Sequence, residues 1–275
     1  MKNLSFRSYL DNWCLDYQTR LNAVALFQPT VCLSEWQQRR YAGAFQNFRG
    51  RFLETVVLPM YRAATDQALP LALKNTLIRG LDAPLSDELG LSTKDGRPYD
   101  QLYCEFAKSL GVDADAALWD DAQYLECIRL YNRSIRGEIV SSVGRGMRHA
   151  VGALTIYWLL ERLDEFDYQL QLEFCSRFSP IRELPQGARG LALKFFEVHA
   201  SLLDAHFDAT PDVPDELWPQ FENEIREASN LLLTIHHQMY VGLSAYVLEN
   251  TQSVNSYAPF ATSLQLSENV TTALH

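Results

Sequence analysis

Residues 194–207 read KFFEVHASLLDAHF, an apolar stretch that holds two of the six histidines of the chain. His199 and His206 are seven residues apart. At about 100° per residue, their directions from a helix differ by only about 20°. Phe195 and Leu202 lie on or beside the same face, which predicts that this face is buried. Two histidines that face a helical core indicate either a metal site or two hydrogen-bonded core residues.

The composition is that of an ordinary globular protein. The chain has 275 residues, of which 47% are hydrophobic and 21% charged, enough for a substantial core. The formal net charge is −10, and no cluster of Lys and Arg interrupts the acidic surface. Because a nucleic-acid partner requires a basic face, we expect a small molecule or a protein as the partner instead.

The sequence predicts a cytoplasmic protein without a membrane partner. The N-terminal segment MKNLSFRSYLDNW is interrupted by polar residues and lacks the apolar run of a signal peptide. No stretch approaches the roughly 18 apolar residues of a membrane span. The five cysteines are odd in number and lack CxxC spacing, so we expect reduced thiols.

Helical periodicity recurs along most of the chain, and we find no β-alternation, no glycine-rich phosphate loop and no GxSxG motif. Ser34 to Gln37 match a capping box, which predicts the start of a long helix that reaches about Ala64. The fold class is therefore all-α, with one domain over residues 1–250 and a flexible C-terminal tail over 251–275. The expected helices span residues 5–26, 34–64, 69–81, 122–136, 153–170, 188–207 and 214–247, with a further helix that Gly111 ends.

Two segments resemble a known family, the haem-oxygenase-like di-iron oxidases and oxygenases. FFEVHASLLDAHF (195–207) resembles the third core-helix signature of that family, in which two histidines seven residues apart bracket an aspartate. DELGLSTKDGRPYDQLYCEFAKSLGVD (87–113) resembles the segment in which a glutamate precedes a glycine-containing loop and a histidine begins the next helix. The resemblance implies a haem-oxygenase-like bundle of about seven core helices. This bundle is related to thiaminase-II-like and cofactorless quinone-forming enzymes.

The resemblance further implies a buried pair of irons that reacts with dioxygen, usually on an amino acid, a fatty acid or an amine in specialised metabolism. Glu54 is assigned by its distance of 34 residues from Glu88, and Asp164 and Glu165 compete with Glu161 for the middle carboxylate. The implied metal ligands are Glu54, Glu88, Glu161, His199 and His206.

Two ligand positions depart from the family pattern. Leu203 stands where an aspartate is expected, and the nearby Asp204 lies about 100° further round a helix. Tyr99 stands where a histidine is expected, and a tyrosinate there or the neighbouring Asp100 could substitute for it. Tyr99 and Asp204 are therefore the candidate catalytic residues. The sequence does not decide whether the site binds two irons, one iron or no metal.

The sequence supports three functional hypotheses. The first is an iron- and dioxygen-dependent oxidase or oxygenase that acts on a small amino-acid, amine or carboxylate substrate, by N-oxygenation, desaturation or oxidative cleavage. The second is a metal-free enzyme or binding protein of the same bundle, with His199, His206 and Tyr99 around an aromatic ligand. The third is a non-catalytic interaction protein. Bundles of this type often pair, so a homodimer is a further expectation.

Overall fold

The computed structural model describes residues 6–65, 69–91, 96–120, 124–142, 145–201 and 213–249. Within these ranges every regular element is helical and there is no strand, so the all-α prediction is confirmed. The predicted tail, residues 251–275, lies outside the described residues. In chain order the elements are α1 (Phe6–Asn22), the 3-10 turn η1 (Ala25–Phe27), α2 (Glu35–Arg49), the π-helical turn η2 (Leu53–Val57), α3 (Leu58–Ala64), α4 (Leu71–Glu88), α5 (Tyr99–Ser109), α6 (Ala114–Trp119), α7 (Glu126–Ser142), α8 (Met147–Ser176), α9 (Ser179–Glu183), α10 (Gln186–Ala200) and α12 (Val213–Leu248).

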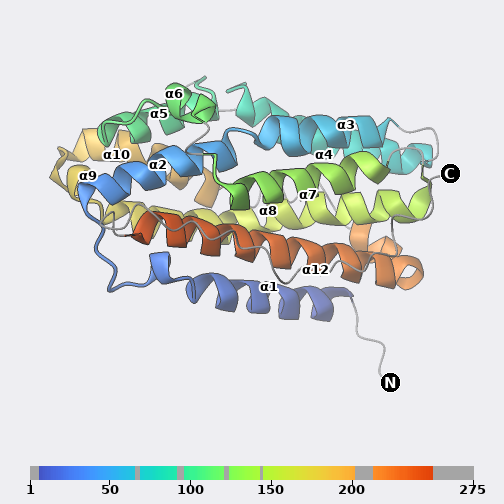
Figure 1. Ribbon diagram of the computed structural model, residues 1–275. Coiled ribbons are helices and arrows are strands. Elements are labelled where there is room, and N and C mark those ends of the chain that lie inside the picture. The colour runs from blue at the N-terminus through green and yellow to red at the C-terminus, as the bar shows by residue number, and fades with distance from the viewer. Residues whose placement is uncertain are drawn as a thin grey trace.

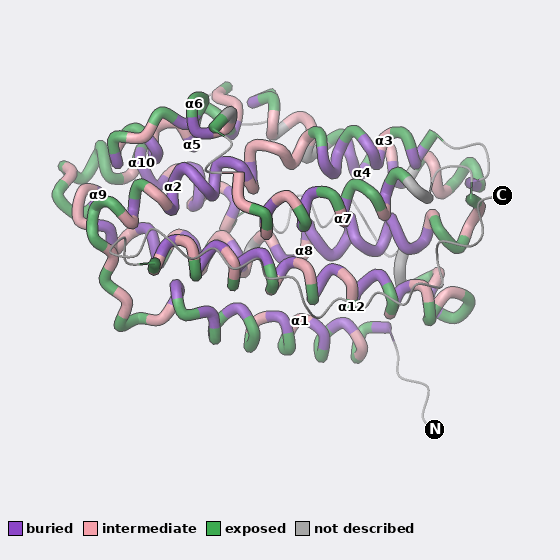
Figure 2. Tube along the Cα trace, in the orientation of Figure 1, coloured by how far each residue is buried: buried purple, intermediate pink, exposed green. Residues whose placement is uncertain are grey.

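The helices form an elongated bundle, with α1 along one edge and α5, α6, α9 and α10 gathered at one end (Figure 1). Helix α8 lies at the centre, where it packs against α7, α10 and α12. Residues 151–161 of α8 are all buried, as expected for a helix that is apolar on every side (Figure 2). The buried apolar side chains form one continuous cluster from Phe6 in α1 to Val247 in α12. Among the described residues, no helix is both long and apolar enough to cross a membrane.

The predicted capping box at the start of α2 is confirmed. The Ser34 hydroxyl accepts a hydrogen bond from the backbone N–H of Gln37 at 3.4 Å, and the Gln37 amide oxygen accepts one from the Ser34 N–H at 3.0 Å. The prediction that this helix continues to Ala64 is wrong, because α2 ends at Arg49. A Cβ at the next residue, Gly50, would lie 2.8 Å from the Gln46 carbonyl oxygen, so this close turn depends on glycine. The π-helical turn η2 then changes the direction of the following side chains.

Helix α4 extends further than the sequence predicts. It was expected to end near Leu81, yet it continues through Pro84 to Glu88. A proline inside a helix has no N–H for the carbonyl four residues earlier, here that of Gly80. The Tyr157 hydroxyl on α8 donates a hydrogen bond to this carbonyl at 3.1 Å. A side chain of the central helix thus replaces the missing backbone bond, and α4 reaches the interior at Glu88.

Helix α10 is shorter than predicted. The periodic pattern predicts a helix to Phe207, but α10 ends at Ala200. The Ser201 hydroxyl donates a hydrogen bond to the Val198 carbonyl oxygen at 2.9 Å, a side-chain bond that competes with continued helix. His199 therefore lies in the last turn of α10, while His206 lies outside the described residues.

Candidate functional site

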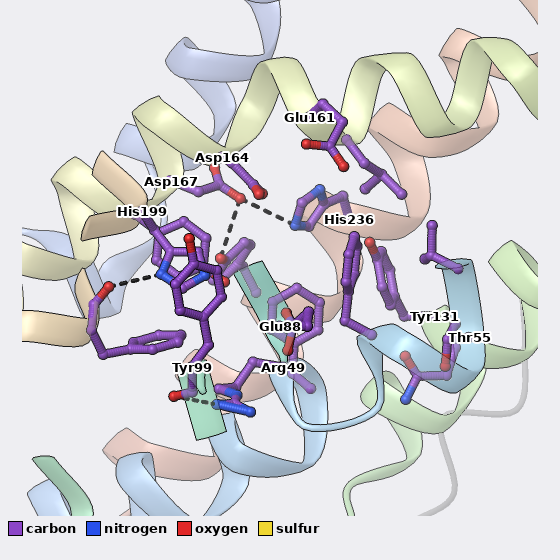
Figure 3. Close-up of a pocket in the computed structure, with 18 residues that line it drawn as sticks. Arg49, Thr55, Glu88, Tyr99, Tyr131, Glu161, Asp164, Asp167, His199 and His236 are labelled. Carbon is purple, nitrogen blue, oxygen red and sulfur yellow. Dashed lines mark hydrogen bonds and ion pairs between the residues drawn. The ribbon is translucent and has the colours of Figure 1, made fainter. Parts of the chain in front are cut away.

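A small buried cavity lies between α8 and the helices around it, with a volume of about 50 Å³. Aromatic rings form much of its wall, among them Phe48, Phe52, Tyr131, Phe195 and Tyr240. Side chains from α4, α8, α10 and α12 add acidic and imidazole groups to this apolar wall (Figure 3). Among the described residues, these are Glu88, Glu161, Asp164, Asp167, His199 and His236.

His199 lies in the last turn of α10 and is only 7% exposed. Its Nδ1 lies 2.8 Å from the carbonyl oxygen of Phe195, and because that oxygen can only accept, Nδ1 carries the proton. Nε2 is then the basic nitrogen of the neutral ring. The rings of Tyr99 and Tyr168 lie 4.2 Å and 4.3 Å from the imidazole, which holds its orientation. Metal-bound histidines commonly have this backbone hydrogen bond, and so do core histidines.

Carboxyl groups from two helices reach the same cavity. Glu161 and Asp164 are three residues apart on α8, so they share one face of that helix, and Glu161 is 7% exposed. Glu88 approaches from the end of α4. Both Glu161 and Asp164 line the cavity, while the side chain of the third alternative, Glu165, lies outside the described set.

The structure does not bring Glu54 to the cavity, which corrects its predicted place among the ligands. Its side chain is 56% exposed and accepts a hydrogen bond from Arg51 at 2.9 Å. The π-helical turn η2 directs the next two side chains, Thr55 and Val56, into the cavity instead. Distance along the chain could not predict this, because one residue added to a helical turn changes which side chain faces inward.

Tyr99 begins α5, is 2% exposed and lines the cavity beside His199. Asp100, the other candidate to replace the expected histidine, points outward with its side chain 64% exposed. Only Tyr99 of these two therefore faces the site. His206, Leu203 and Asp204 lie outside the described residues.

Arg49 is a buried cation that sequence reasoning missed. Its side chain is 4% exposed, lines the cavity and forms an ion pair with Asp100. The guanidinium also lies 5.1 Å from the ring centre of Phe195 and 3.5 Å from the Tyr99 carbonyl oxygen. These contacts join the end of α2 to the start of α5, so Arg49 helps to position Tyr99. The only sequence signal was a charged residue between two aromatic ones, Phe48 and Phe52.

Asp167 and His236 form a second buried group; the sequence did not single out Asp167, and it indicated only that at most one of the adjacent His236 and His237 faces inward. Oδ1 of Asp167 accepts a hydrogen bond from the Tyr17 hydroxyl, and Oδ2 accepts one from Tyr240 at 3.4 Å. Nε2 of His236 lies 3.3 Å from the same Oδ2. Burial raises the pKa of Asp167 to about 7 against the lowering effect of the two hydroxyls, and burial lowers the pKa of His236 to about 3.

The donor chemistry of the cavity suits a metal such as iron(II), because neutral imidazole and carboxyl groups are common ligands for it. Arg49, which pairs with Asp100, is the only Lys or Arg among the described residues that line the cavity. A bound cation would offset the negative charge of the carboxylates that bind it. However, no three His, Cys, Asp or Glu side chains of the described residues are grouped so that they could hold one ion. The described residues thus offer donor types that suit iron(II), but their positions in this structure do not form a ligand set for an ion.

Neither the family models nor the curated proteins that were searched contain a match to this chain. The functional argument therefore depends on the side chains that line the cavity.

Proposed function

We propose that the protein is an iron- and dioxygen-dependent oxidase or oxygenase with a haem-oxygenase-like bundle. Its substrate would be a small amino acid, amine or carboxylate, and its reaction N-oxygenation, desaturation or oxidative cleavage. One observation carries the proposal. Glu88, Glu161 and His199 come from three different helices and line one buried cavity, where a backbone hydrogen bond leaves Nε2 of His199 as the basic nitrogen.

In this proposal Glu88, Glu161 and His199 hold the metal, with Asp164 as a further carboxylate. We propose one iron in place of the two that the resemblance implies, because Glu54 points to solvent and Tyr99 replaces a histidine. Bound iron supplies a reducible centre at which dioxygen can react.

The protein side chains have separate tasks around that centre. Phe48, Phe52 and Phe195 exclude water, which preserves the strength of the polar interactions inside. The Tyr99 and Tyr168 rings keep the His199 imidazole in place. Arg49 holds the first turn of α5, and with it Tyr99, against the cavity.

The size of the cavity favours a metal and dioxygen over an aromatic ligand. For comparison, an engineered apolar cavity of about 150 Å³ binds benzene. The cavity here is about 50 Å³, so it holds a metal ion and a few small molecules as it stands. Any organic substrate requires the cavity to widen, and an aromatic one requires the most.

The second candidate function is a metal-free enzyme or binding protein. Two observations favour it: the close contact of the Tyr99 and His199 rings at 4.2 Å, and the lack of a three-donor metal group among the described residues. In this case Tyr99 and His199 act as acid–base groups on a bound ligand.

Metal analysis of the purified protein after anaerobic loading with iron(II) separates these functions. We expect about one iron per chain and a chromophore that forms when oxygen is admitted, since carboxylate and imidazole donors bind iron(II). His199→Ala should lose the metal, whereas Glu54→Ala, at an exposed carboxylate, should keep it. A wild-type protein that binds no iron, or a His199→Ala variant that binds it normally, would rule out the iron proposal.

A further inference from the structure

His236 is a buried histidine whose ring has no conventional partner. The residue is 2% exposed, and its side chain lines the same cavity as His199 (Figure 3). Both ring nitrogens are fully buried, and neither makes a hydrogen bond to any residue that the structure describes. Buried polar atoms in proteins almost always have a partner, so an exception next to a cavity indicates a partner that binds there.

Asp167 is placed to orient this ring. Its Oδ2 lies 3.3 Å from Nε2 of His236, a close approach that falls short of hydrogen-bond geometry. The hydroxyls of Tyr17 and Tyr240 each donate a hydrogen bond to one oxygen of the carboxyl group. A proton on Nε2 would face Asp167 and leave Nδ1 as the basic nitrogen. Metal-binding histidines are commonly oriented in this way by a carboxylate at the second nitrogen.

The aromatic residues around His236 explain why no other side chain in the described part of the chain bonds its nitrogens. The rings of Phe48, Tyr131 and Tyr240 lie 5.8 Å, 5.2 Å and 5.3 Å from the imidazole. Ring faces fix the position of the imidazole without bonding its nitrogens in the ring plane. The next residue, His237, is half-buried and does not line the cavity, so it offers a natural comparison on the same helix.

We propose that Nδ1 of His236 is a metal ligand of the cavity, with Asp167 as the positioning residue at Nε2. None of the ligands that the family resemblance implies lies on α12. His236 would thus supply an imidazole from α12, a helix that carries none of the implied ligands. It would add a histidine to a site in which Tyr99 stands where the resemblance predicts one. Glu161 and Asp164 of α8 would be its carboxylate partners. Because these donors are not grouped around one point in the structure, metal binding has to draw them together.

This inference rests on the proposed function and is tested by metal affinity. The probes are iron(II) and manganese(II), titrated anaerobically into the full-length protein in competition with a chelator. We expect His236→Gln to weaken binding by at least about 10- to 100-fold, the range reported even for groups that only orient a ligand. His237→Gln is the matched control and should bind as the wild type does. Asp167→Asn should weaken binding while the helical content remains.

A spectroscopic measurement on the wild-type protein tests the ligand role of His236 without any variant. Histidine labelled with ¹⁵N can be followed by NMR as zinc(II), a diamagnetic substitute, is added. We expect Nδ1 of His236 to show the shift of a metal-bound nitrogen while Nε2 stays protonated. This readout also decides the question if His236→Gln fails to fold.

Each outcome bears on a different claim. If the wild type binds metal, and His236→Gln binds as tightly as His237→Gln, the ligand role of His236 is wrong while the proposed function survives. The same holds if only His199 signals respond to zinc(II). If the wild type binds neither iron(II) nor manganese(II), the proposed function fails, and this inference fails with it.

Discussion

The Tyr157 hydroxyl in α8 donates a hydrogen bond to the Gly80 carbonyl oxygen in α4 at 3.1 Å. Pro84 cannot provide the N–H that this carbonyl would otherwise accept. Burial, together with the neighbouring Glu161 carboxyl group, raises the pKa of Tyr157 well above its ordinary value, so the hydroxyl keeps its proton. One tyrosine on the central helix therefore supports the last turn of α4, which carries Glu88 to the cavity.

Tyr157→Phe should destabilise the protein by about 1–3 kcal/mol, because the Gly80 carbonyl loses its partner in a buried place. Urea unfolding followed by circular dichroism measures this change. Pro84→Ala in the Tyr157→Phe background restores an N–H for the same carbonyl and should recover part of the loss. Equal stability of Tyr157→Phe and the wild type would show that the bond does not support α4.

The buried pair of Asp167 and His236 predicts an unusual pH dependence for the metal-free protein. The raised pKa of Asp167, about 7, stabilises the folded state at low pH, and this stabilisation is lost as the pH rises from about 4 to about 7. The lowered pKa of His236, about 3, has the opposite effect, because the unfolded state gains a proton as the pH falls below about 6.5. Between about pH 4 and 6.5 the two effects should cancel.

A variant that lacks one residue of the pair should reveal how the other residue changes the free energy of unfolding with pH. In His236→Gln the free energy of unfolding should fall from pH 4 to pH 7, by on the order of 4 kcal/mol for a shift of about three pKa units. In Asp167→Asn it should rise between pH 3 and about 6.5. Urea unfolding at a series of pH values, with a chelator present, measures both. The tyrosines around the pair, Tyr17, Tyr131 and Tyr240, do not titrate in this window because burial raises their pKa values well above the usual range. Parallel pH profiles for the two variants would contradict this assignment.

Gly242 allows α12 to approach α7 closely. A Cβ at this position would lie 2.5 Å from Cβ of Cys127 and 2.7 Å from its Sγ. Gly242→Ala should therefore destabilise the protein by about 1–3 kcal/mol through overpacking. Gly137→Ala in α7 is the matched control, since its added Cβ meets nothing within 4 Å, and it should be neutral or stabilising by up to about 1 kcal/mol. Thermal unfolding of the two variants checks the contrast, and similar melting temperatures would count against it.

Glu161→Gln should lower iron(II) affinity at least about tenfold, because a buried carboxylate would lose its charge and part of its donor strength. Glu54→Gln should leave affinity unchanged, since this exposed side chain pairs with Arg51 outside the cavity. Anaerobic titration with a competing chelator measures both constants. Equal affinity in the two variants would place the metal away from α8.

Local patterns in the sequence predicted much of the fold. The capping box at Ser34 depends on residues three apart, and it is present as expected. Apolar periodicity identified α1, α7, α8 and α12, although several of their ends differ from the predicted ones. The continuation of α4 through Pro84 could not be predicted, because the group that compensates for the proline is Tyr157, 73 residues further along the chain.

The sequence by itself determined the all-α class, since residue type and periodicity are local properties, and its resemblance to a known family drew attention to Glu88, Glu161 and His199. Only the tertiary structure decided that these three line one cavity, that Glu54 does not, and that Arg49, Asp167 and His236 do. For Glu54 the physical reason is that the π-helical turn η2 changes which side chain faces inward. Whether a buried polar atom has a partner likewise depends on side chains far away in the chain, as it does for His236.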